Sequence, residues 1–415
     1  MNINTFIAFR SRNYRLYFTG QSISLIGTWM QRTAVSWVVY TITHSTLMLG
    51  LTWFASQFPS FLFSLFGGVV SDRYNRYKVL LFTQVASLIQ AGILTTLVFL
   101  QEATVWRILG MGVLLGIINA FDVPARQALV YDMVDNKDDL PNAIALNSSM
   151  VNLARLIGPA VSGIVLDKLG NGVSFLLNTA SFLAVIVSLL LMKLPAYIAT
   201  EHKQKVMGEM KEGFRYLKRT PSIGLLLLML ACMSFLVLPF NTLLPVYAKE
   251  IFKGNASIFG YINSFIGVGS ISGAFFLASL KPGTNLYRIL FINTILFGIG
   301  LILFSHETNF SLAMFFAALA GFGMMSQTTI TNTILQTIVA ISMRGRVISF
   351  YAMAFFGMQP FGSLLVGAIS NFWGAPNTIL TEGIIAIVIA LIFMPFLRKE
   401  HSKMKIKKPV KDELM

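Results

Sequence analysis

The sequence has little of the charge that a water-soluble protein of its size carries. Charged residues make up only 12% of the 415 residues, whereas ordinary globular domains have about 25%. Hydrophobic residues make up 55%, and the mean hydropathy is +0.70. A soluble fold of this length cannot bury so much apolar surface, but a lipid bilayer solvates it. The composition therefore excludes an ordinary soluble protein and predicts an integral membrane protein.

Residues that carry enzyme chemistry are also scarce. The single cysteine, Cys232, lies in an apolar run and cannot form an internal disulfide. The four histidines fall in predicted loops or tails and form no cluster: His44, His202, His306 and His401. The sequence contains no glycine-rich phosphate-binding loop and no Ser, His and Asp constellation. We therefore predict no enzyme activity, no metal, no cofactor and no ATP-driven mechanism.

Twelve apolar stretches are long enough to cross a bilayer as helices, which takes about 20 residues each. Helices are expected because an isolated strand cannot satisfy its backbone hydrogen bonds in lipid. The predicted fold class is therefore an all-α membrane protein with twelve transmembrane helices. The stretches cover residues 16–41, 47–70, 78–100, 105–127, 143–166, 172–193, 222–247, 257–280, 287–305, 309–333, 347–370 and 377–397.

One long polar segment, residues 200–221, divides the stretches into two sets of six. We predict an N-terminal six-helix half at 1–199, a C-terminal half at 222–397 and a basic cytoplasmic tail at 398–415. The segment between the halves is a flexible cytoplasmic linker or contains an amphipathic helix that lies on the membrane surface. The helix is favoured, because four apolar residues recur at helical spacing: Met207, Met210, Phe214 and Leu217.

The net charge of +15 suggests nucleic-acid binding, but the positions of the basic residues argue against it. If the N-terminus is cytoplasmic, most of the 32 Lys and Arg residues lie in predicted cytoplasmic loops and tails. The opposite side keeps only Arg107, Lys168, Lys249 and Lys253. Positive-inside asymmetry of this kind predicts a multi-pass protein of the cytoplasmic (inner) membrane with both termini inside. Membrane lipid is then an expected partner, nucleic acid is not, and a monomer is expected.

The loop after the second stretch carries the most specific motif. Gly68 would let two helices approach closely, and Asp72 could cap or bond a neighbouring helix end. Arg73 and Arg76 could clamp carboxylates across a helix interface. The pattern resembles the signature loop of the major facilitator superfamily, Gly-x-x-x-Asp-Arg-x-Gly-Arg-Arg/Lys. Asn75 stands where that family has glycine, although asparagine also tolerates a left-handed backbone.

Further pieces resemble one branch of the superfamily, which includes the bacterial enterobactin exporter and macrolide-efflux proteins. They are Gly20–Gln21, Gly27–Gln31, Leu49–Leu51, Phe121–Gln127, Asn142–Ile144, Arg155–Pro159, Leu244–Pro245 and Arg344–Val347. In the fifth stretch, Gly158, Pro159 and Gly163 are similar to the Gly-Pro element of the superfamily's antiporters, which is associated with export. The alternative is a kinked, tightly packed helix without a coupling role.

Two arginines fall inside predicted membrane segments, where ionisable groups are costly and therefore candidates for function. Arg32, with Trp29 and Gln31, could line a central cavity for an anionic or aromatic substrate. Alternatively, Arg32 is paired internally or reaches out to the interface. Arg155, with Asn152, could contact substrate or pair with a carboxylate.

Two carboxylates also fall inside predicted segments. Asp122 could be a protonatable group of the transport cycle, or it could form a structural ion pair with Arg126 or with Arg73. We favour the second interpretation, a gate at the inner face, because the resemblance implies that the signature loop bonds to adjacent helices. Glu382 is the best-placed second carboxylate for proton coupling, unless it is a water-exposed residue at the outer end of the last helix.

These observations predict a secondary active transporter that exports an amphipathic small molecule, a siderophore-like metabolite or a drug. The expected mechanism is proton antiport with alternating access of the two halves to a central site. An importer or a lysophospholipid flippase of the same fold is the first alternative, and a membrane-embedded enzyme or receptor is the distant one. The expected partners are therefore a small-molecule substrate and protons, in addition to membrane lipid.

Overall fold

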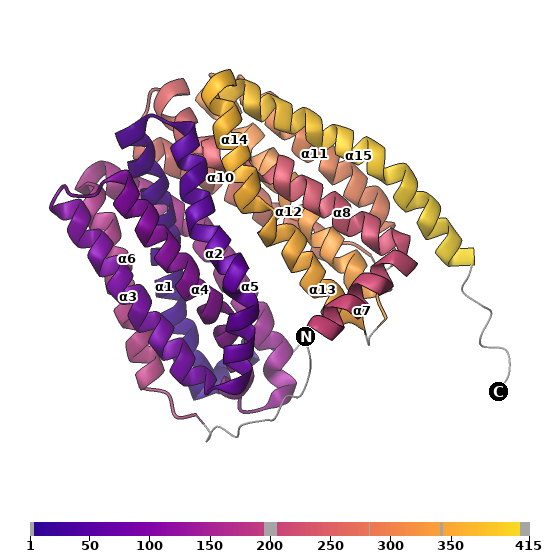
Figure 1. The fold of residues 1–415 in the computed structure, drawn as a ribbon, viewed down its shortest axis with the longest axis horizontal. Coiled ribbons are helices and arrows are strands. Elements are labelled where there is room, and N and C mark those ends of the chain that lie inside the picture. The colour runs from indigo at the N-terminus through magenta and orange to yellow at the C-terminus, as the bar shows by residue number, and fades with distance from the viewer. Residues whose placement is uncertain (1–3, 195–205, 282, 341–342, 407–415) are drawn as a thin grey trace. The chain divides into compact units, whose positions relative to one another are not determined.

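The computed structural model describes residues 4–194, 206–281, 283–340 and 343–406, and every regular element in these residues is helical (Figure 1). The first half contains α1 (Arg12–Thr43), α2 (Thr46–Arg73), α3 (Arg76–Phe99), α4 (Val105–Met133), α5 (Leu140–Leu169) and α6 (Asn171–Leu190). The second contains α7 (Val206–Arg219), α8 (Pro221–Leu236), α9 (Leu244–Val246), α10 (Ala256–Ala278), α11 (Leu286–Ser305), α12 (Phe310–Ile338), α13 (Arg344–Ala352), α14 (Gln359–Trp373) and α15 (Ala375–Ile406). Short helical turns, such as Leu238–Leu243 and Met353–Gly357, connect some of them.

Eleven stretches of the described helices are long and apolar enough to cross a membrane. They are α2, α3, α4, α6, α10, α11, α12, the part of α15 to Leu397, and the composite stretches Lys137–Leu169, Pro221–Ile251 and Arg344–Trp373. The remaining predicted stretch, 16–41, lies within α1, whose 32 residues are also long enough to span a bilayer. The predicted all-α class with twelve membrane helices is therefore confirmed.

Polar side chains cap the beginnings of several helices. The Asn75 side chain accepts hydrogen bonds from the backbone N–H groups of Tyr77 (3.0 Å) and Lys78 (3.2 Å) at the start of α3. Thr104 caps α4 in the same way. These caps satisfy N–H groups that have no partner within the helix. Asn75 does not use the left-handed backbone that asparagine tolerates, because its φ of −60° and ψ of 109° are those of an extended N-cap residue.

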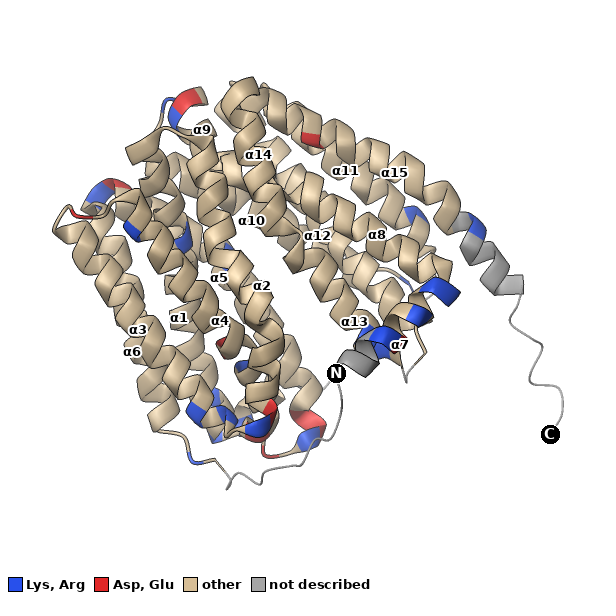
Figure 2. Ribbon diagram, viewed as in Figure 1, with Lys and Arg blue, Asp and Glu red and all other residues tan. Residues whose placement is uncertain are grey.

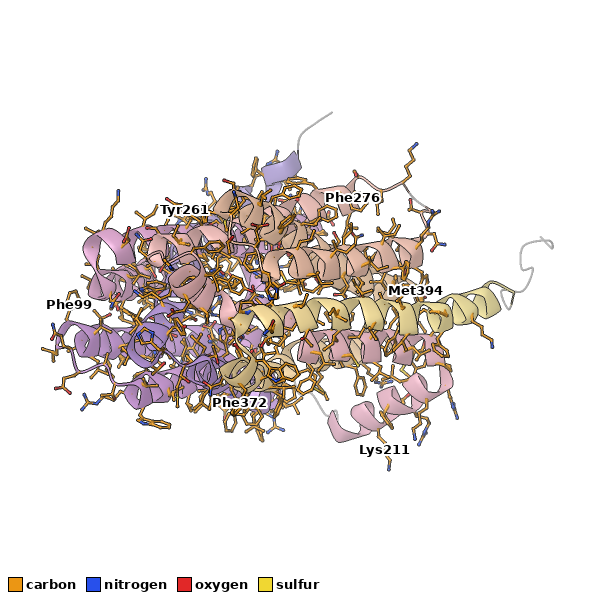
Figure 3. All side chains as sticks on the ribbon, turned by 90° about the horizontal axis from the view of Figure 1, so that it is seen from above. Phe99, Lys211, Tyr261, Phe276, Phe372 and Met394 are labelled. Atoms are coloured by element: carbon orange, nitrogen blue, oxygen red, sulfur yellow. The ribbon has the colours of Figure 1, made fainter. Side chains whose placement is uncertain are left out.

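Apolar side chains cover the outside of the helices as well as the inside. Phe82 is 74% exposed and Phe372 is 84% exposed, and Figure 3 labels Phe372 together with the exposed Phe99 and Phe276. Charged residues gather mainly near the ends of the helices, whereas the middles are almost free of them (Figure 2). Lipid stabilises this distribution, whereas water does not.

Contacts along the chain divide it into two compact units. The first comprises Met1–Lys203, Thr242–Gly267 and Ser363–Asn371, and the second comprises Gln204–Asn241, Val268–Gly362 and Phe372–Met415. The predicted domain boundaries at 199, 221 and 397 stay predictions.

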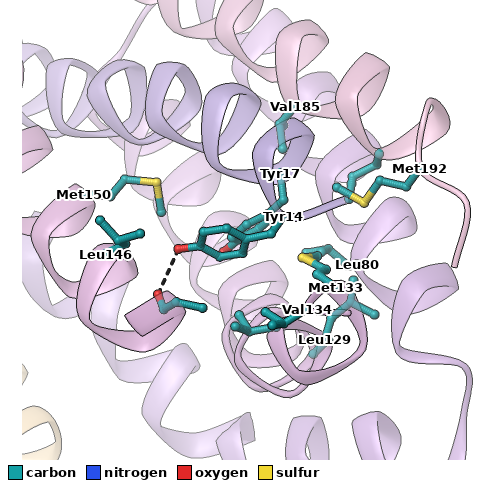
Figure 4. Packing of buried hydrophobic residues seen from close by; sticks show 14 of the residues in the cluster. Tyr14, Tyr17, Leu80, Leu129, Met133, Val134, Leu146, Met150, Val185 and Met192 are labelled. Carbon is teal, nitrogen blue, oxygen red and sulfur yellow. Dashed lines mark hydrogen bonds between the residues drawn. The ribbon is translucent and has the colours of Figure 1, made fainter. Parts of the chain in front are cut away.

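A buried cluster in the first unit ties the start of α1 to α3, α4, α5 and α6 (Figure 4). Tyr14 and Tyr17 of α1 lie among Leu80, Met133 and Met150. The Tyr14 hydroxyl donates a hydrogen bond to the Ala143 carbonyl oxygen at 2.8 Å, so its polar end is satisfied within the apolar cluster. This packing fixes α4 against α1 and α3 near the carboxylate of Asp122.

The predicted amphipathic helix corresponds to α7, which packs on α13 within the second unit. Glu212 and Arg346 form an ion pair at 3.2 Å, and the Ala340 N–H donates to the Tyr216 hydroxyl at 3.4 Å. Figure 3 shows Lys211 projecting from α7. The side chains of Met207 and Met210 lie outside the described residues, so the position on the membrane surface stays a prediction.

Candidate functional site

The loop between α2 and α3 contains two adjacent glycines with different surroundings. A Cβ atom at Gly67 would overlap the backbone carbonyl oxygen of Ala120 in α4. A Cβ atom at Gly68 would meet no atom within 4 Å. The close helix approach that the sequence assigned to Gly68 is therefore corrected to Gly67, because one position turns a side chain by about 100° around a helix.

The charged residues of the loop differ in their engagement. Arg76 lies 3.8 Å from the Asp132 carboxylate of α4, so it does bridge two helices. Asp72 and Arg73 are exposed in the last turn of α2. Arg73 forms no ion pair with any residue in the described parts of the chain.

Asp122 of α4 is buried, with 1% of its surface exposed, and its carboxylate is fully engaged. Its Oδ1 accepts hydrogen bonds from Thr83 Oγ1 at 2.9 Å and Gln84 Nε2 at 2.6 Å, both from α3. Its Oδ2 forms a close ion pair with Arg126, one turn later in α4. Of the two partners that the sequence allowed, the structure therefore has Arg126 and not Arg73.

Thr83 and Gln84 were not identified from the sequence. The available signal was an adjacent pair of polar residues inside the apolar stretch 78–100. Such a pair is costly in a membrane helix unless it meets another polar group.

Two arginines share one tryptophan in the middle of the first unit. The guanidinium carbon of Arg32 lies over the Trp29 ring, 5.0 Å from its centre, and that of Arg155 lies 5.6 Å from the same centre. Both arginines are partly buried, and neither forms an ion pair within the described parts of the chain. The structure thus brings Arg155 of α5 to Trp29 and Arg32 of α1, with which it was not grouped in the sequence analysis.

Gly158 explains how Arg155 reaches α1. A Cβ atom at Gly158 would lie 2.5 Å from Trp29 Cβ and 3.1 Å from the Ile26 carbonyl oxygen. Only glycine therefore permits α5 to pack this closely on α1 at Trp29. The close contact places Arg155, one turn earlier in α5, beside the indole.

Gln31 belongs to a buried chain of amides. It accepts a hydrogen bond from Asn178 Nδ2 of α6 at 2.6 Å, and its own Nε2 is 3.4 Å from Gln90 Oε1 of α3. Gln90 donates in turn to the Met111 carbonyl oxygen of α4 at 3.1 Å. These hydrogen bonds connect four helices, so Gln31 helps to hold the first unit together.

A pocket of about 590 Å³, including its open mouth, lies within the first unit between α1, α2, α3 and α4. Its wall combines hydrocarbon surface with a few polar side chains, as in typical small-molecule sites. Arg32 supplies the charge of the wall. Its lining residues are Gln31, Arg32, Val35, Ser36, Thr52, Trp53, Ser56, Gln57, Gln90, Leu94, Ile108, Gly112, Leu115 and Asn119.

Sequence reasoning missed Trp53, Gln57 and Asn119 of this wall. Uncharged amides and a tryptophan inside apolar stretches were the only signal, and they do not reveal which face of the helix they occupy. Asn152, which was predicted with Arg155, instead donates to the Ser148 carbonyl oxygen of its own helix at 3.0 Å.

The small residues of α5 form a second close contact further along the helix. A Cβ atom at Gly163 would lie 2.7 Å from the Ala256 carbonyl oxygen, and one at Gly260 of α10 would lie 2.7 Å from the Pro159 carbonyl oxygen. Pro159 and Gly163 are buried, in keeping with tight helix packing. An export-specific role of this element stays a prediction.

Glu382 of α15 is buried, with 2% of its surface exposed, and lies in the second unit. Neither of its carboxylate oxygens has a hydrogen-bond partner among the described residues. The next residue, Gly383, forms a close crossing with Gly298 of α11, where a Cβ atom would lie 2.7 Å from the Gly298 carbonyl oxygen. The predicted alternative of a water-exposed outer residue is therefore wrong.

Within the described residues, no group of three or more His, Cys, Asp or Glu side chains could hold a metal ion. The described residues instead offer a partly polar pocket in the first unit and a buried carboxyl group without a partner at Glu382.

Comparison with known proteins places these features in a family context. The model of the family described as transmembrane secretion effector matches residues 3–414. The staphyloferrin A transporter of Staphylococcus aureus is 27% identical over 399 residues, which cover 94% of this chain and 98% of that protein. The macrolide efflux protein A of Streptococcus pyogenes is 21% identical over 390 residues, with 92% and 96% coverage. The enterobactin exporter of Escherichia coli is 24% identical over 384 residues, with 92% and 91% coverage.

A solved structure supports the same fold. A bacterial homologue of the human lysosomal transporter Spinster superposes with a TM-score of 0.75 at 14% sequence identity, covering 94% of this chain and 98% of that one. This likeness shows the fold alone. The predicted resemblance to the major facilitator superfamily, and to the branch with siderophore and macrolide exporters, is confirmed.

Proposed function

Since the chain belongs to the transmembrane secretion effector family of the major facilitator superfamily, we propose that it is a proton-coupled exporter of an amphipathic small molecule. It is a multi-pass membrane transporter of the efflux type, related to transporters and not to enzymes. The relatives named for staphyloferrin A, enterobactin and macrolides suggest a siderophore-like metabolite or a drug as cargo. Transport runs outwards across the cytoplasmic membrane, with both termini in the cytoplasm.

The observation that carries the proton coupling is the isolation of Glu382. A carboxylate with no partner in a membrane helix is strongly disfavoured, so the side chain is held as the neutral acid while it stays buried. The proton leaves when the transport cycle admits water or a cation to this part of α15. One buried acid that is neutral in one state and ionised in another is sufficient to couple a proton to a conformational change.

The pocket of the first unit supports a cargo with both apolar and polar parts. Its wall presents hydrocarbon from Leu94, Ile108 and Leu115 beside the amides of Gln57 and Asn119. An amphipathic molecule satisfies both kinds of surface, whereas a purely apolar one would leave the amides without partners.

Asp122 and the signature loop act in the gate and not in proton transfer. Asp122 already has Thr83, Gln84 and Arg126 as partners, which stabilise its charged form at the place where it lies. Arg76 and Asp132 join α3 to α4 close by. We propose that these contacts hold the inner-face ends of α2, α3 and α4 together during one half of the cycle.

The test is pH-driven transport in everted membrane vesicles that contain the full chain. A pH gradient that is acidic inside the vesicles should drive uptake of labelled cargo. The compounds to be tested are iron-free enterobactin, erythromycin and ethidium. Nigericin, which collapses the pH gradient, should abolish the uptake. Uptake that ignores nigericin would rule out proton antiport, and accumulation only in right-side-out vesicles would reverse the proposed direction.

A further inference from the structure

Arg32 and Arg155 place two positive charges at Trp29, and a cargo that binds there must complement them. From their positions we infer that the site takes a polycarboxylate anion, with one carboxylate on Arg32 and a second on Arg155. The inference rests on the proposed transport function and specifies the substrate class of the same site. It depends on three observations in the first unit, which are the shared indole, the missing counter-ions and the pocket beside Arg32.

The guanidinium N–H groups of the two arginines have no hydrogen-bond acceptor among the described residues. Arg32 and Arg155 lie over the Trp29 ring with their guanidinium carbons 5.0 and 5.6 Å from its centre. No group in the described residues accepts a hydrogen bond from either guanidinium group, whose N–H donors lie along the edge of a rigid plane. The same edge makes paired hydrogen bonds to both oxygens of a carboxylate. Trp29 therefore lies against both arginines, while the described residues leave their N–H donors available to a carboxylate.

The site lacks a negative charge of its own. Neither arginine forms an ion pair with any described residue, and the ion pairs of this unit lie at other residues: His44–Glu250, Arg76–Asp132, Arg107–Glu102 and Arg126–Asp122. Two like charges beside one ring repel each other in surroundings that screen them poorly. An anion with at least two carboxylates removes this repulsion, whereas a cation increases it.

The pocket gives the rest of such a molecule a place. Arg32 lies on its wall, together with the amides of Gln57 and Asn119 and the ring of Trp53. No described group forms a hydrogen bond with any of these three side chains, so the amides are open to the hydroxyl or amide groups of a ligand. Selectivity for the anion then comes from the arginines, and the amides and Trp53 orient the remainder.

Binding to the purified full-length protein in lipid nanodiscs tests the inference, with radiolabelled citrate as a simple polycarboxylate probe. Unlabelled citrate should displace the label, whereas neutral trimethyl citrate and cationic ethidium should not. Arg32→Gln and Arg155→Gln should each weaken citrate binding by about 10- to 100-fold, the loss expected when a charge-assisted pair is removed. Arg288→Gln, at an exposed arginine at the start of α11, is the matched control and should bind like wild type.

Arg32→Lys separates charge from geometry. It retains the positive charge but loses the planar edge, so citrate binding should fall between that of wild type and Arg32→Gln. Failure of citrate to bind wild type at millimolar concentrations, equal displacement by trimethyl citrate, or unchanged binding in both glutamine variants would overturn the polycarboxylate assignment. Nigericin-sensitive uptake of ethidium or erythromycin would still uphold export in that case, so the two proposals fail separately.

Discussion

Two buried carboxylates, Asp122 in α4 and Glu382 in α15, lie in opposite chemical surroundings. Asp122 accepts hydrogen bonds from Thr83 and Gln84 and pairs with Arg126. Glu382 is equally buried but has no partner among the described residues. A carboxylate with three partners is stabilised as an anion and serves packing, whereas one without partners is stabilised as a neutral acid and can exchange a proton. Burial alone therefore does not distinguish the two carboxylates, and the proposal of Glu382 as the proton carrier rests on burial together with the partner set.

The largest effect should come from removing the isolated acid. Glu382→Gln keeps the shape of the side chain but cannot release a proton, so we expect pH-driven uptake into everted vesicles to fall by about tenfold or more. The unfolding midpoint should change little, because a neutral amide replaces a neutral acid. Glu307→Gln, at a partly exposed loop residue before α12, is the control. If Glu382→Gln took up cargo at the wild-type rate, the proposal that Glu382, unlike Asp122, carries the proton would be wrong.

Removing the partnered acid should act on stability instead of coupling. Asp122→Ala leaves Arg126 partly buried without its counter-ion, so the free energy of unfolding should fall by about 3 kcal/mol. Thermal unfolding of the purified protein measures this, with Asp132→Ala as the control on the same helix. Asp132 forms a longer, more exposed pair with Arg76, and its loss should cost less than about 1 kcal/mol. The transport that remains in Asp122→Ala should still respond to nigericin. If the response were lost in Asp122→Ala but kept in Glu382→Gln, Asp122 would be the proton carrier and Glu382 would not.

The packing that positions Asp122 gives the next largest effect. In Gly67→Ala the new Cβ overlaps the Ala120 carbonyl oxygen, two residues before Asp122, so α2 must move away from α4 at a cost of about 1–3 kcal/mol. Gly68→Ala is the matched neighbour, where the Cβ enters open space. A helical alanine there should be neutral or stabilising by about 0.5–1 kcal/mol. Equal losses in the two variants would contradict the assignment of the close approach to Gly67.

The smallest effect is expected from removing one hydrogen-bond partner of Asp122, which makes its surroundings more like those of Glu382. Gln84→Leu deletes the 2.6 Å hydrogen bond to Oδ1, which should lower the free energy of unfolding by about 1.5 kcal/mol. Thermal unfolding measures the change, and Gln57→Leu serves as the control, because Gln57 lies on the pocket wall and not beside Asp122. A loss in Gln57→Leu as large as that in Gln84→Leu would mean that the amide at 84 has no special role at the carboxylate.

Much of the fold was predictable because a membrane helix can be recognised from its local sequence alone. A helix that crosses lipid needs a run of apolar residues of fixed length, and each of the twelve predicted stretches lies in helix in the structure. The details that failed depend on neighbours that are remote in sequence. The close approach belongs to Gly67 and not to Gly68, because α4 lies on one side of α2 and not on the other.

The candidate site was predictable in its residue types but not in its connections. Arg32, Arg155, Asp122 and Glu382 were identifiable because a charge inside an apolar stretch is rare and costly. The partners Thr83, Gln84 and Trp53 were not, since uncharged polar residues are tolerated in membrane helices on any buried face.

The amino-acid sequence by itself determined the membrane class, the number of helices and the family, since these follow from local hydrophobicity and from a motif confined to one loop. Only the tertiary structure decided that Arg32 and Arg155 meet at one indole, that Asp122 is paired, and that Glu382 has no partner among the described residues. The reason is geometric. Whether a polar side chain finds a partner depends on the rotation and close contact of helices from distant parts of the chain, and in lipid that partner decides whether the group carries charge.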